Sequence, residues 1–350
     1  MKIIQSVRVF LCLLFLLLPL NVHAGDRFSN YDEEETGAAA IGLEGWFSQA
    51  EAKWQISFPF QLQYSTLASS GFPAGTTGKI ESELTFKKID SPLYIFTAGS
   101  QVDQDISFDV MYGAGSISGG HGTDEDRFIA ASGKGIEFSE SQNSLNGDVR
   151  QWGLNFYYNN KRFTDNQNSP WGMVLGYLHY TDRLRMTNAV QVVSTNFENM
   201  QFPPPGPFPQ FPVFNSTYDF TWDLFKVGVL YQPRLTQSLS LTGSVSVYPY
   251  VNYEGDGYWN LRTTGPNAFR SQSPNFTQTS TTGYGYEASL GLTYAVMQNL
   301  ELFGGYRYFY LHAENGTDTT YFADGTQARS NLDWVTVTRQ GAYAGAAFKF

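Results

Sequence analysis

The chain has 350 residues, a formal net charge of −10 and a large share of aromatic residues, 16% of the total. A chain this acidic is poorly suited to the phosphate backbone of DNA or RNA, so no nucleic-acid partner is expected. No stretch after Leu20 approaches the roughly 20 apolar residues of a membrane helix, which excludes a helical membrane protein.

The first element is predicted to be a cleaved secretory signal, residues 1–24. Lys2 and Arg8 provide a positively charged start, and an apolar run from Val9 to Leu20 follows. This run is too short to cross a bilayer, and the small residue Ala24 suits the cleavage site of signal peptidase. The protein is therefore expected to be exported.

The only cysteine, Cys12, lies inside the predicted signal. The mature chain is thus expected to have neither disulfides nor thiolate ligands for a metal. Residues 25–37 are polar and acidic and are predicted to be a flexible lead-in to a single folded domain, residues 38–350.

From residue 38 onward, apolar and polar residues alternate with a period of two, which is typical of β-strands. The clearest runs are Leu239 to Val251, where serine and threonine separate the apolar residues, and Tyr286 to Val296. Counting such runs predicts ten strands and leaves twelve open. The predicted strands are 38–58, 79–101, 105–130, 148–163, 171–195, 218–232, 238–262, 276–296, 300–321 and 331–350.

Two features favour a barrel in lipid over a soluble sandwich with the same alternation. Tyr286 and Tyr294 share one apolar face, and at ~3.3 Å per residue and ~40° of tilt they lie roughly 20 Å apart in height, close to the spacing of two aromatic girdles. The chain also ends on Phe350, which looks like the membrane-targeting signal of bacterial outer-membrane barrels. The sequence therefore predicts an all-β fold, a transmembrane antiparallel up-and-down β-barrel of about ten long strands in the cell outer membrane. The expected partners are membrane lipid and the barrel-assembly machinery.

The connections are predicted to alternate between short periplasmic turns and long external loops. The short turns are expected near 101–104, 232–237 and 297–299, and the long loops near 59–78, 133–147, 200–217, 263–275 and 322–330. The loop at 200–217 is rich in proline and phenylalanine and is predicted to be a stiff cover or a ligand for a partner. Several predicted strands are about twice as long as the ~10 residues that a bilayer needs, so the barrel is expected to project above the membrane.

Common catalytic and metal-binding motifs are absent from the sequence. It contains no Gly-x-Ser-x-Gly, no His-Glu-x-x-His and no glycine-rich phosphate loop. Only His121, His179 and His312 follow the predicted signal, and they are too scattered for a transition-metal site. Neither a metal nor another cofactor is expected.

Several local patterns resemble the omptins, the outer-membrane proteases of enteric bacteria. These patterns are Ser82-Glu83-Leu84-Thr85-Phe86, the run from Gly113-Ala114-Gly115 to Asp124-Glu125-Asp126, Glu254-Gly255-Asp256-Gly257-Tyr258, and the final Gly345-Ala346-Ala347-Phe348-Lys349-Phe350. They are short, but together they extend over nearly all of the mature chain. The resemblance implies a ten-stranded barrel with an endopeptidase site in its external groove.

In omptins an Asp-x-Asp pair faces a second acidic run that ends in a histidine base. By this resemblance the first pair corresponds to Asp124 and Asp126. The acids of the second run correspond to Glu254 and Asp256, and an acidic specificity residue on the first strand corresponds to Glu51.

The histidine position of this pattern is occupied by Tyr258. The reaction needs a base that titrates near neutral pH, and a tyrosine with a pKa near 10 cannot replace imidazole. His121 or His312 would have to serve instead. The resemblance therefore implies a degenerate catalytic site, with an omptin-like endopeptidase kept as an alternative.

A second, weaker resemblance, in size, signal and tyrosine-rich composition, is to the porin-like outer-membrane proteins of the Protochlamydia type. The serine- and threonine-lined inner face of the predicted strand 238–262 favours a porin-like channel or surface protein that admits small solutes. Glu287 and Glu301 lie inside predicted strands and are candidates for charge in the lumen. The sequence thus predicts a porin-like channel or surface protein without protease activity, with a protease and an adhesin as alternatives, and it leaves the oligomeric state open.

Overall fold

The computed structural model describes residues 39–63, 72–103, 105–160, 169–195, 197–198, 202–208, 213–264 and 268–350. The predicted signal and lead-in lie outside these residues. Within them, thirteen strands form one antiparallel sheet, accompanied by the short 3-10 helix η2 (Asn260–Arg262). The strands are β1 (Ala39–Gln61), β2 (Thr77–Gln101), β3 (Ile106–Ile117), β4 (Gly119–Ala130), β5 (Gly135–Tyr158), β6 (Trp171–Ser194), β7 (Gly206–Pro207), β8 (Ser216–Tyr231), β9 (Leu239–Tyr258), β10 (Phe276–Ser280), β11 (Thr282–Met297), β12 (Leu300–Tyr321) and β13 (Gln327–Lys349).

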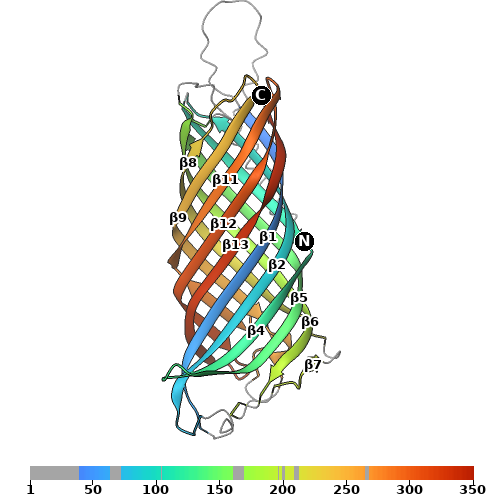
Figure 1. The fold of residues 1–350 in the computed structure, drawn as a ribbon, viewed down its shortest axis with the longest axis vertical. Coiled ribbons are helices and arrows are strands. Elements are labelled where there is room, and N and C mark those ends of the chain that lie inside the picture. The colour runs from blue at the N-terminus through green and yellow to red at the C-terminus, as the bar shows by residue number, and fades with distance from the viewer. Residues whose placement is uncertain are drawn as a thin grey trace, which may run out of the picture. The chain divides into compact units, whose positions relative to one another are not determined.

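The strand pairings close the sheet into a ring. The first strand, β1, pairs with both β2 and the last strand, β13, and each remaining long strand pairs with its neighbours in the chain. Two long strands are interrupted by a single residue, β3 and β4 at Ser118 and β10 and β11 at Thr281, while the two-residue β7 pairs with β6. The described residues therefore form a ring of ten long antiparallel strands, which Figure 1 shows running side by side at a steep tilt. This confirms the predicted up-and-down barrel.

One predicted loop is wrong. The segment 133–147 belongs almost entirely to β5, which begins at Gly135 and is joined to β4 by a tight turn. The segment from Ser139 to Ser144 is polar on both faces, because one face lines a cleft and the other lies beyond the apolar surface described below. The sequence therefore lacks the alternation that identified the other strands.

Large apolar side chains cover the outer face of the barrel near the end where β1 begins and β13 finishes, here called the terminal end. Exposed apolar residues from nearly every long strand form this belt: Leu43, Phe47, Tyr94, Phe96, Trp152, Phe156, Trp171, Met173, Leu175, Phe225, Val229, Val245, Val247, Tyr286, Leu290, Leu292, Tyr294, Leu302, Tyr306 and Phe348. The belt includes the predicted girdle residues Tyr286 and Tyr294, which are 41% and 50% exposed. Such a band is the lipid-facing surface of an outer-membrane barrel.

The strands continue well beyond this belt. β2 has 25 residues and β5 has 24, against the ~10 that a tilted strand needs to cross the hydrocarbon layer. The far end, here called the loop end, carries the connections β1–β2, β6–β8 and β9–β10, the longest on that side. Long loops face outward in this class of barrel, so the loop end is assigned to the exterior. No helix among the described residues is long and apolar enough to span a membrane.

Bulky side chains fill the middle of the barrel. On β8, Tyr218, Phe220, Trp222 and Leu224 all point inward and are 0% exposed. Their rings pack closely, with 4.5 Å between the centroids of Tyr218 and Phe220. We call these residues, together with Phe86, Asp182, Tyr253 and Arg339, the interior layer. A barrel of eight strands is just wide enough to be filled by its own side chains. The interior layer shows that this wider ring is also filled at the level of these residues.

Candidate functional site

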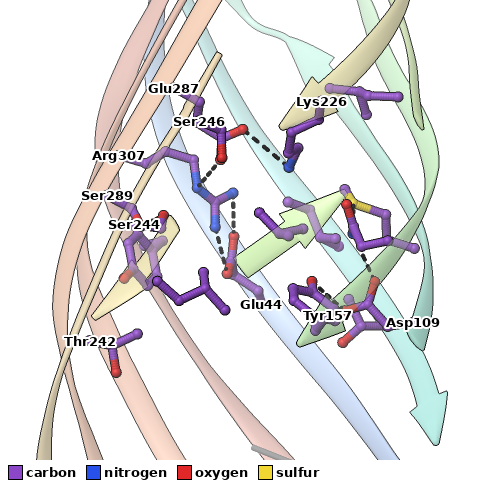
Figure 2. A pocket seen from close by; sticks show the side chains of 18 of the residues that line it. Glu44, Asp109, Tyr157, Lys226, Thr242, Ser244, Ser246, Glu287, Ser289 and Arg307 are labelled. Atoms are coloured by element: carbon purple, nitrogen blue, oxygen red, sulfur yellow. Dashed lines mark hydrogen bonds and ion pairs between the residues drawn. The ribbon is translucent and has the colours of Figure 1, made fainter. Parts of the chain in front are cut away.

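A polar cavity lies inside the barrel on the terminal side of the interior layer, and we call it the lumen cavity (Figure 2). It has a volume of about 200 Å³. One wall carries the serine and threonine residues of β9 and β11, with 2.7 Å between the hydroxyls of Ser244 and Ser289. These hydroxyls point inward because they alternate with the apolar residues that face lipid.

Four of the five charged residues that line the lumen cavity pair with one another, and the fifth, Asp109, accepts hydrogen bonds from Asn155 and Tyr157. Arg307 lies 2.9 Å from Glu44 and 3.6 Å from Glu287, and Lys226 lies 3.5 Å from Glu287 (Figure 2). The hydroxyl of Tyr248 donates a hydrogen bond of 2.6 Å to Glu287. Glu287 therefore lies on the inner face, as expected for a lumen charge, but it is paired with Arg307, Lys226 and Tyr248.

The second lumen candidate, Glu301, also lies on the inner face, since it alternates with the exposed Leu302. It forms an ion pair of 2.8 Å with Lys349 near the terminal end. Phe350, the predicted targeting residue, is 69% exposed, and its ring packs against Phe348 with 5.1 Å between centroids.

A larger cavity of about 860 Å³ lies on the other side of the interior layer, and we call it the loop-end cleft. Its polar residues come mainly from β4, β5 and β6, and its apolar residues come mainly from the connections β6–β8 and β9–β10. The polar residues include Asp124, Asp126, Ser139, Ser141, Asn143, Gln191 and Arg262, and the aromatic ones are Phe202, Phe208, Phe214, Trp259, Phe269 and Phe322. The cleft thus combines a polar floor with aromatic walls.

The two aspartates of the floor lie on one face of β4. Residues two apart on a strand point the same way, and Asp124 and Asp126 share the inner face with the buried Phe128. Ser141 on β5 lies directly opposite Asp124. The structure therefore brings the Asp-x-Asp pair into the cleft.

Both carboxyl groups have perturbed acidity. Burial, together with the neighbouring Asp126, raises the pKa of Asp124 to about 7, against the opposing effect of the positive charge of Arg262. Burial also raises the pKa of Asp126, while Arg262 and a hydrogen bond from Ser82 lower it. Within the described part of the chain, no basic side chain lies within ion-pair distance of either aspartate.

The other residues of the omptin pattern are not in this cleft. Glu254, Asp256 and Tyr258 alternate with buried residues of β9 and so lie on the outer face of the barrel. The reason is packing on the inner face, where the glycines at 255 and 257 leave room for the rings of Tyr218 and Phe276. The acids are consequently on the opposite side of the wall from the aspartate pair.

The remaining candidates also face outward. Glu51 forms an ion pair of 2.7 Å with Lys53 on the outer face of β1. Of the three histidines in the described residues, His121 is exposed, His179 lies 2.8 Å from Asp223, and His312 lies 3.3 Å from Glu314. None of the three lines the loop-end cleft.

Arg262, Asn143 and Trp259 are residues of the cleft that the sequence did not indicate. No local motif marks them, because they meet only when the β9–β10 connection lies over β4 and β5. A partial signal existed for the walls, since Phe202, Phe208 and the prolines beside them belong to the segment noted for its composition.

Comparison with known proteins agrees with this architecture. The family model described as Protochlamydia outer membrane protein matches residues 47–341. Among solved structures, the outer membrane protease OmpT from Escherichia coli is similar with a TM-score of 0.64 and 15% identity, covering 92% of this chain and 99% of that one. The Ail protein of Yersinia pestis, with a TM-score of 0.30, 12% identity and coverage of 90% and 99%, is a more distant match. No curated protein matches the chain.

Both resemblances expected from the sequence are thus confirmed, one at the level of the family and the other at the level of the fold. At 15% identity the likeness to OmpT concerns the fold alone.

Proposed function

The chain belongs to the Protochlamydia outer membrane protein family, and on this premise we propose that it is a surface protein that acts through its loop end and has no protease activity. In this proposal residues 1–24 direct export and are removed, and the barrel-assembly machinery inserts residues 38–350. The lipid-facing belt anchors the terminal half of the barrel, and the loop end projects outside.

The observation that carries the proposal is the interior layer. On β8, four fully buried side chains separate Ser216, which lines the loop-end cleft, from Lys226, which lines the lumen cavity. On β6, the buried Asp182 and Leu184 likewise separate Tyr180, which lines the lumen cavity, from Met186, which lines the loop-end cleft. A solute would have to displace these side chains to pass, so the accessible working surface is the loop end.

Planar-bilayer recording tests this arrangement. Purified protein inserted into a bilayer is expected to give no discrete conductance steps. Resistance of the unboiled barrel to SDS verifies that the protein is folded, and its recovery with liposomes of the same lipid verifies insertion. Deletion of Phe350 is expected to reduce the amount of SDS-resistant barrel in cells. Large, regular steps from the wild-type protein would contradict the proposal.

A narrow channel is the second candidate, and the hydroxyl-rich and charged lining of the lumen cavity favours it. If small steps are observed, Glu287→Gln and Glu301→Gln should change the cation-to-anion permeability ratio, because both carboxylates lie on the inner face. The matched control is Glu254→Gln on the outer face, which should leave the ratio unchanged.

The absence of protease activity is supported by the placement of the residues of the omptin pattern. Asp124 and Asp126 face the cleft, whereas Asp256 and Tyr258 face outward, so none of the described residues that line the cleft can serve as the base opposite the aspartates. Incubation with a mixed peptide library should give no cleavage. Cleavage by the wild type that is abolished by Asp124→Asn would contradict this part of the proposal.

A further inference from the structure

We propose that the loop-end cleft binds a small zwitterionic ligand, with an amine and a carboxylate on an apolar or aromatic body, as in an amino acid. The inference rests on the proposed role of the loop end as the working surface and adds the chemical class of the ligand. It draws on the unpaired polar groups of the cleft, the position of Arg262 and the aromatic walls.

Two hydrogen-bond acceptors on the floor of the cleft, Asn143 Oδ1 and the Asp124 carboxylate, have no donor among the described residues. Asn143 is only 7% exposed, and its Oδ1 has no hydrogen-bond partner among the described residues. Gly122, opposite Asn143 on β4, leaves the space that this side chain occupies. Asp124 lies on the same side of the sheet, next to Gly122 along the inner face, and has no ion pair in the described part of the chain. Buried polar atoms normally have partners, so these acceptors point to a ligand that donates.

A protonated amine is the donor that fits this floor. An ammonium group has three donors and no acceptor, and it can satisfy the carboxylates of Asp124 and Asp126 and the amide oxygen of Asn143 together. Its positive charge also opposes the mutual repulsion of the two carboxylates. A neutral hydroxyl would satisfy fewer of these acceptors and would leave that repulsion in place.

Arg262 supplies the opposite charge. Its guanidinium lies 5.7 Å from the ring of Phe269, and its charge influences both aspartates without lying within ion-pair distance of either. A guanidinium binds a carboxylate through two parallel hydrogen bonds. A ligand whose amine and acid groups are a few bonds apart would therefore pair with both sides of the cleft at once.

The aromatic walls indicate that the body of the ligand, between or beside its charged groups, is apolar or aromatic. Phe208 and Phe214 pack edge to face with 5.5 Å between centroids, and Trp259 lies on the opposite connection. Cavities that bind small molecules are mostly apolar, have few converging polar groups and measure roughly 300–1,000 Å³. The loop-end cleft, with about 860 Å³, fits this description. A bare metal ion would leave the aromatic walls without a contact.

Calorimetric titration of the full chain in detergent can test each half of the ligand separately. The probes are phenylalanine, which carries both charges, phenethylamine, which lacks the carboxylate, and 3-phenylpropionate, which lacks the amine. The variants are Asp124→Asn and Arg262→Gln, with Glu254→Gln on the outer face as the matched control. SDS resistance of each unboiled variant confirms that the barrel is folded.

We expect phenylalanine to bind at least about tenfold more tightly than either half-ligand, because each charged hydrogen-bonded contact contributes about this factor. Arg262→Gln should weaken phenylalanine about tenfold and leave phenethylamine unchanged, while Asp124→Asn should weaken both. The control should bind like the wild type.

Three outcomes overturn the inference: no binding of any probe, equal binding of phenylalanine and 3-phenylpropionate, or equal losses in the control and the cleft variants. Equal binding of phenylalanine and phenethylamine would overturn the role of Arg262 and reduce the ligand class to amines. These results are independent of the conductance and cleavage experiments. If no probe binds, the ligand proposal fails and the proposed function still stands. If the barrel binds phenylalanine but also conducts ions, only the proposed function is contradicted.

Discussion

The lumen cavity and the loop-end cleft contain similar charged groups in different arrangements. In the lumen cavity, Arg307 is held 2.9 Å from Glu44, and Glu287 is shared between Arg307 and Lys226. In the cleft, Asp124 and Arg262 share one space without an ion pair. Burial costs free energy for an unpaired charge, so the paired charges of the lumen cavity are consistent with a structural role and the unpaired Asp124 carboxylate with a site kept open for a ligand.

The position of each region relative to the membrane sharpens this contrast. The lumen cavity lies inside the part of the barrel that carries the lipid-facing belt, where a self-neutralised network closes the interior. The cleft lies beyond the belt, where the wall no longer contacts lipid and the loops cover the opening. The interior layer keeps the two regions apart. Substitutions in the layer and in the two regions can therefore test the contrast.

The largest effect is expected at Arg339, which is 0% exposed and donates a hydrogen bond of 2.7 Å to Asp182, itself 0% exposed. Arg339→Met leaves the Asp182 carboxylate buried without its cation, which should lower the free energy of unfolding by about 3–5 kcal/mol. Guanidinium unfolding in detergent measures this loss. The double variant Arg339→Met/Asp182→Leu should recover much of it. A double variant no more stable than the single one would show that Arg339 acts through its other contacts, such as Ser48.

A somewhat smaller loss is expected at Trp222, together with a new property. Trp222→Ala removes a fully buried side chain that packs 4.6 Å from the ring of Tyr253, and the cavity should cost about 3 kcal/mol. It should also thin the interior layer between the lumen cavity and the loop-end cleft. If the layer is the barrier, this variant should give small conductance steps that the wild type lacks. Leu332→Ala, at a buried position elsewhere in the core, is the control for destabilisation alone.

Much of this architecture could be predicted from the sequence, because within the lipid-facing belt the outer side of the strands is apolar and the side that lines the lumen cavity is largely polar. The run containing Tyr286 and Tyr294 shows this, and both residues lie on the lipid-facing belt. The prediction fails where the strands leave the membrane. From Ser139 to Ser144 both faces of the strand are polar, so the alternation disappears and β5 resembles a loop.

The site was only half predictable for a related reason. Asp124 and Asp126 are two residues apart, and a strand places such a pair on one face. Which face it is depends on the neighbouring residues, and β9 shows the difficulty. Gly255 and Gly257 are required on its inner face by Tyr218 and Phe276, which turns Asp256 outward. A sequence pattern of acids contains no information about this packing.

A moderate, pH-dependent effect is expected for Asp124→Asn. Burial raises the pKa of Asp124 from 3.8 to about 7, so the folded barrel binds this proton more tightly than the unfolded chain does. Stability from this group is therefore full below about pH 4 and is lost as the pH rises towards 7. The variant should unfold at a higher denaturant concentration than the wild type at pH 8 and at the same concentration at pH 4. The same change should weaken phenylalanine binding, as expected if the carboxylate lowers the stability of the folded barrel but is needed to bind the ligand.

The smallest effect is expected at Tyr258. The side chain lies on the outer face of β9, where its hydroxyl donates a hydrogen bond of 3.3 Å to the carbonyl of Ser271. Tyr258→His restores the residue type of the omptin pattern, but the imidazole would stand on the other side of the barrel wall from Asp124 and Asp126. A general base has to come within about 3 Å of the proton that it removes, or reach it through one water, so the variant should cleave no peptide. Its stability should also stay within about 0.5 kcal/mol of the wild type, as for most surface substitutions. Both are measured on one sample, by a peptide library and by denaturant unfolding. Cleavage gained by Tyr258→His and lost again in Tyr258→His/Asp124→Asn would show that β9 turns its acids inward in solution, and the separation of the two parts of the omptin pattern would then be wrong.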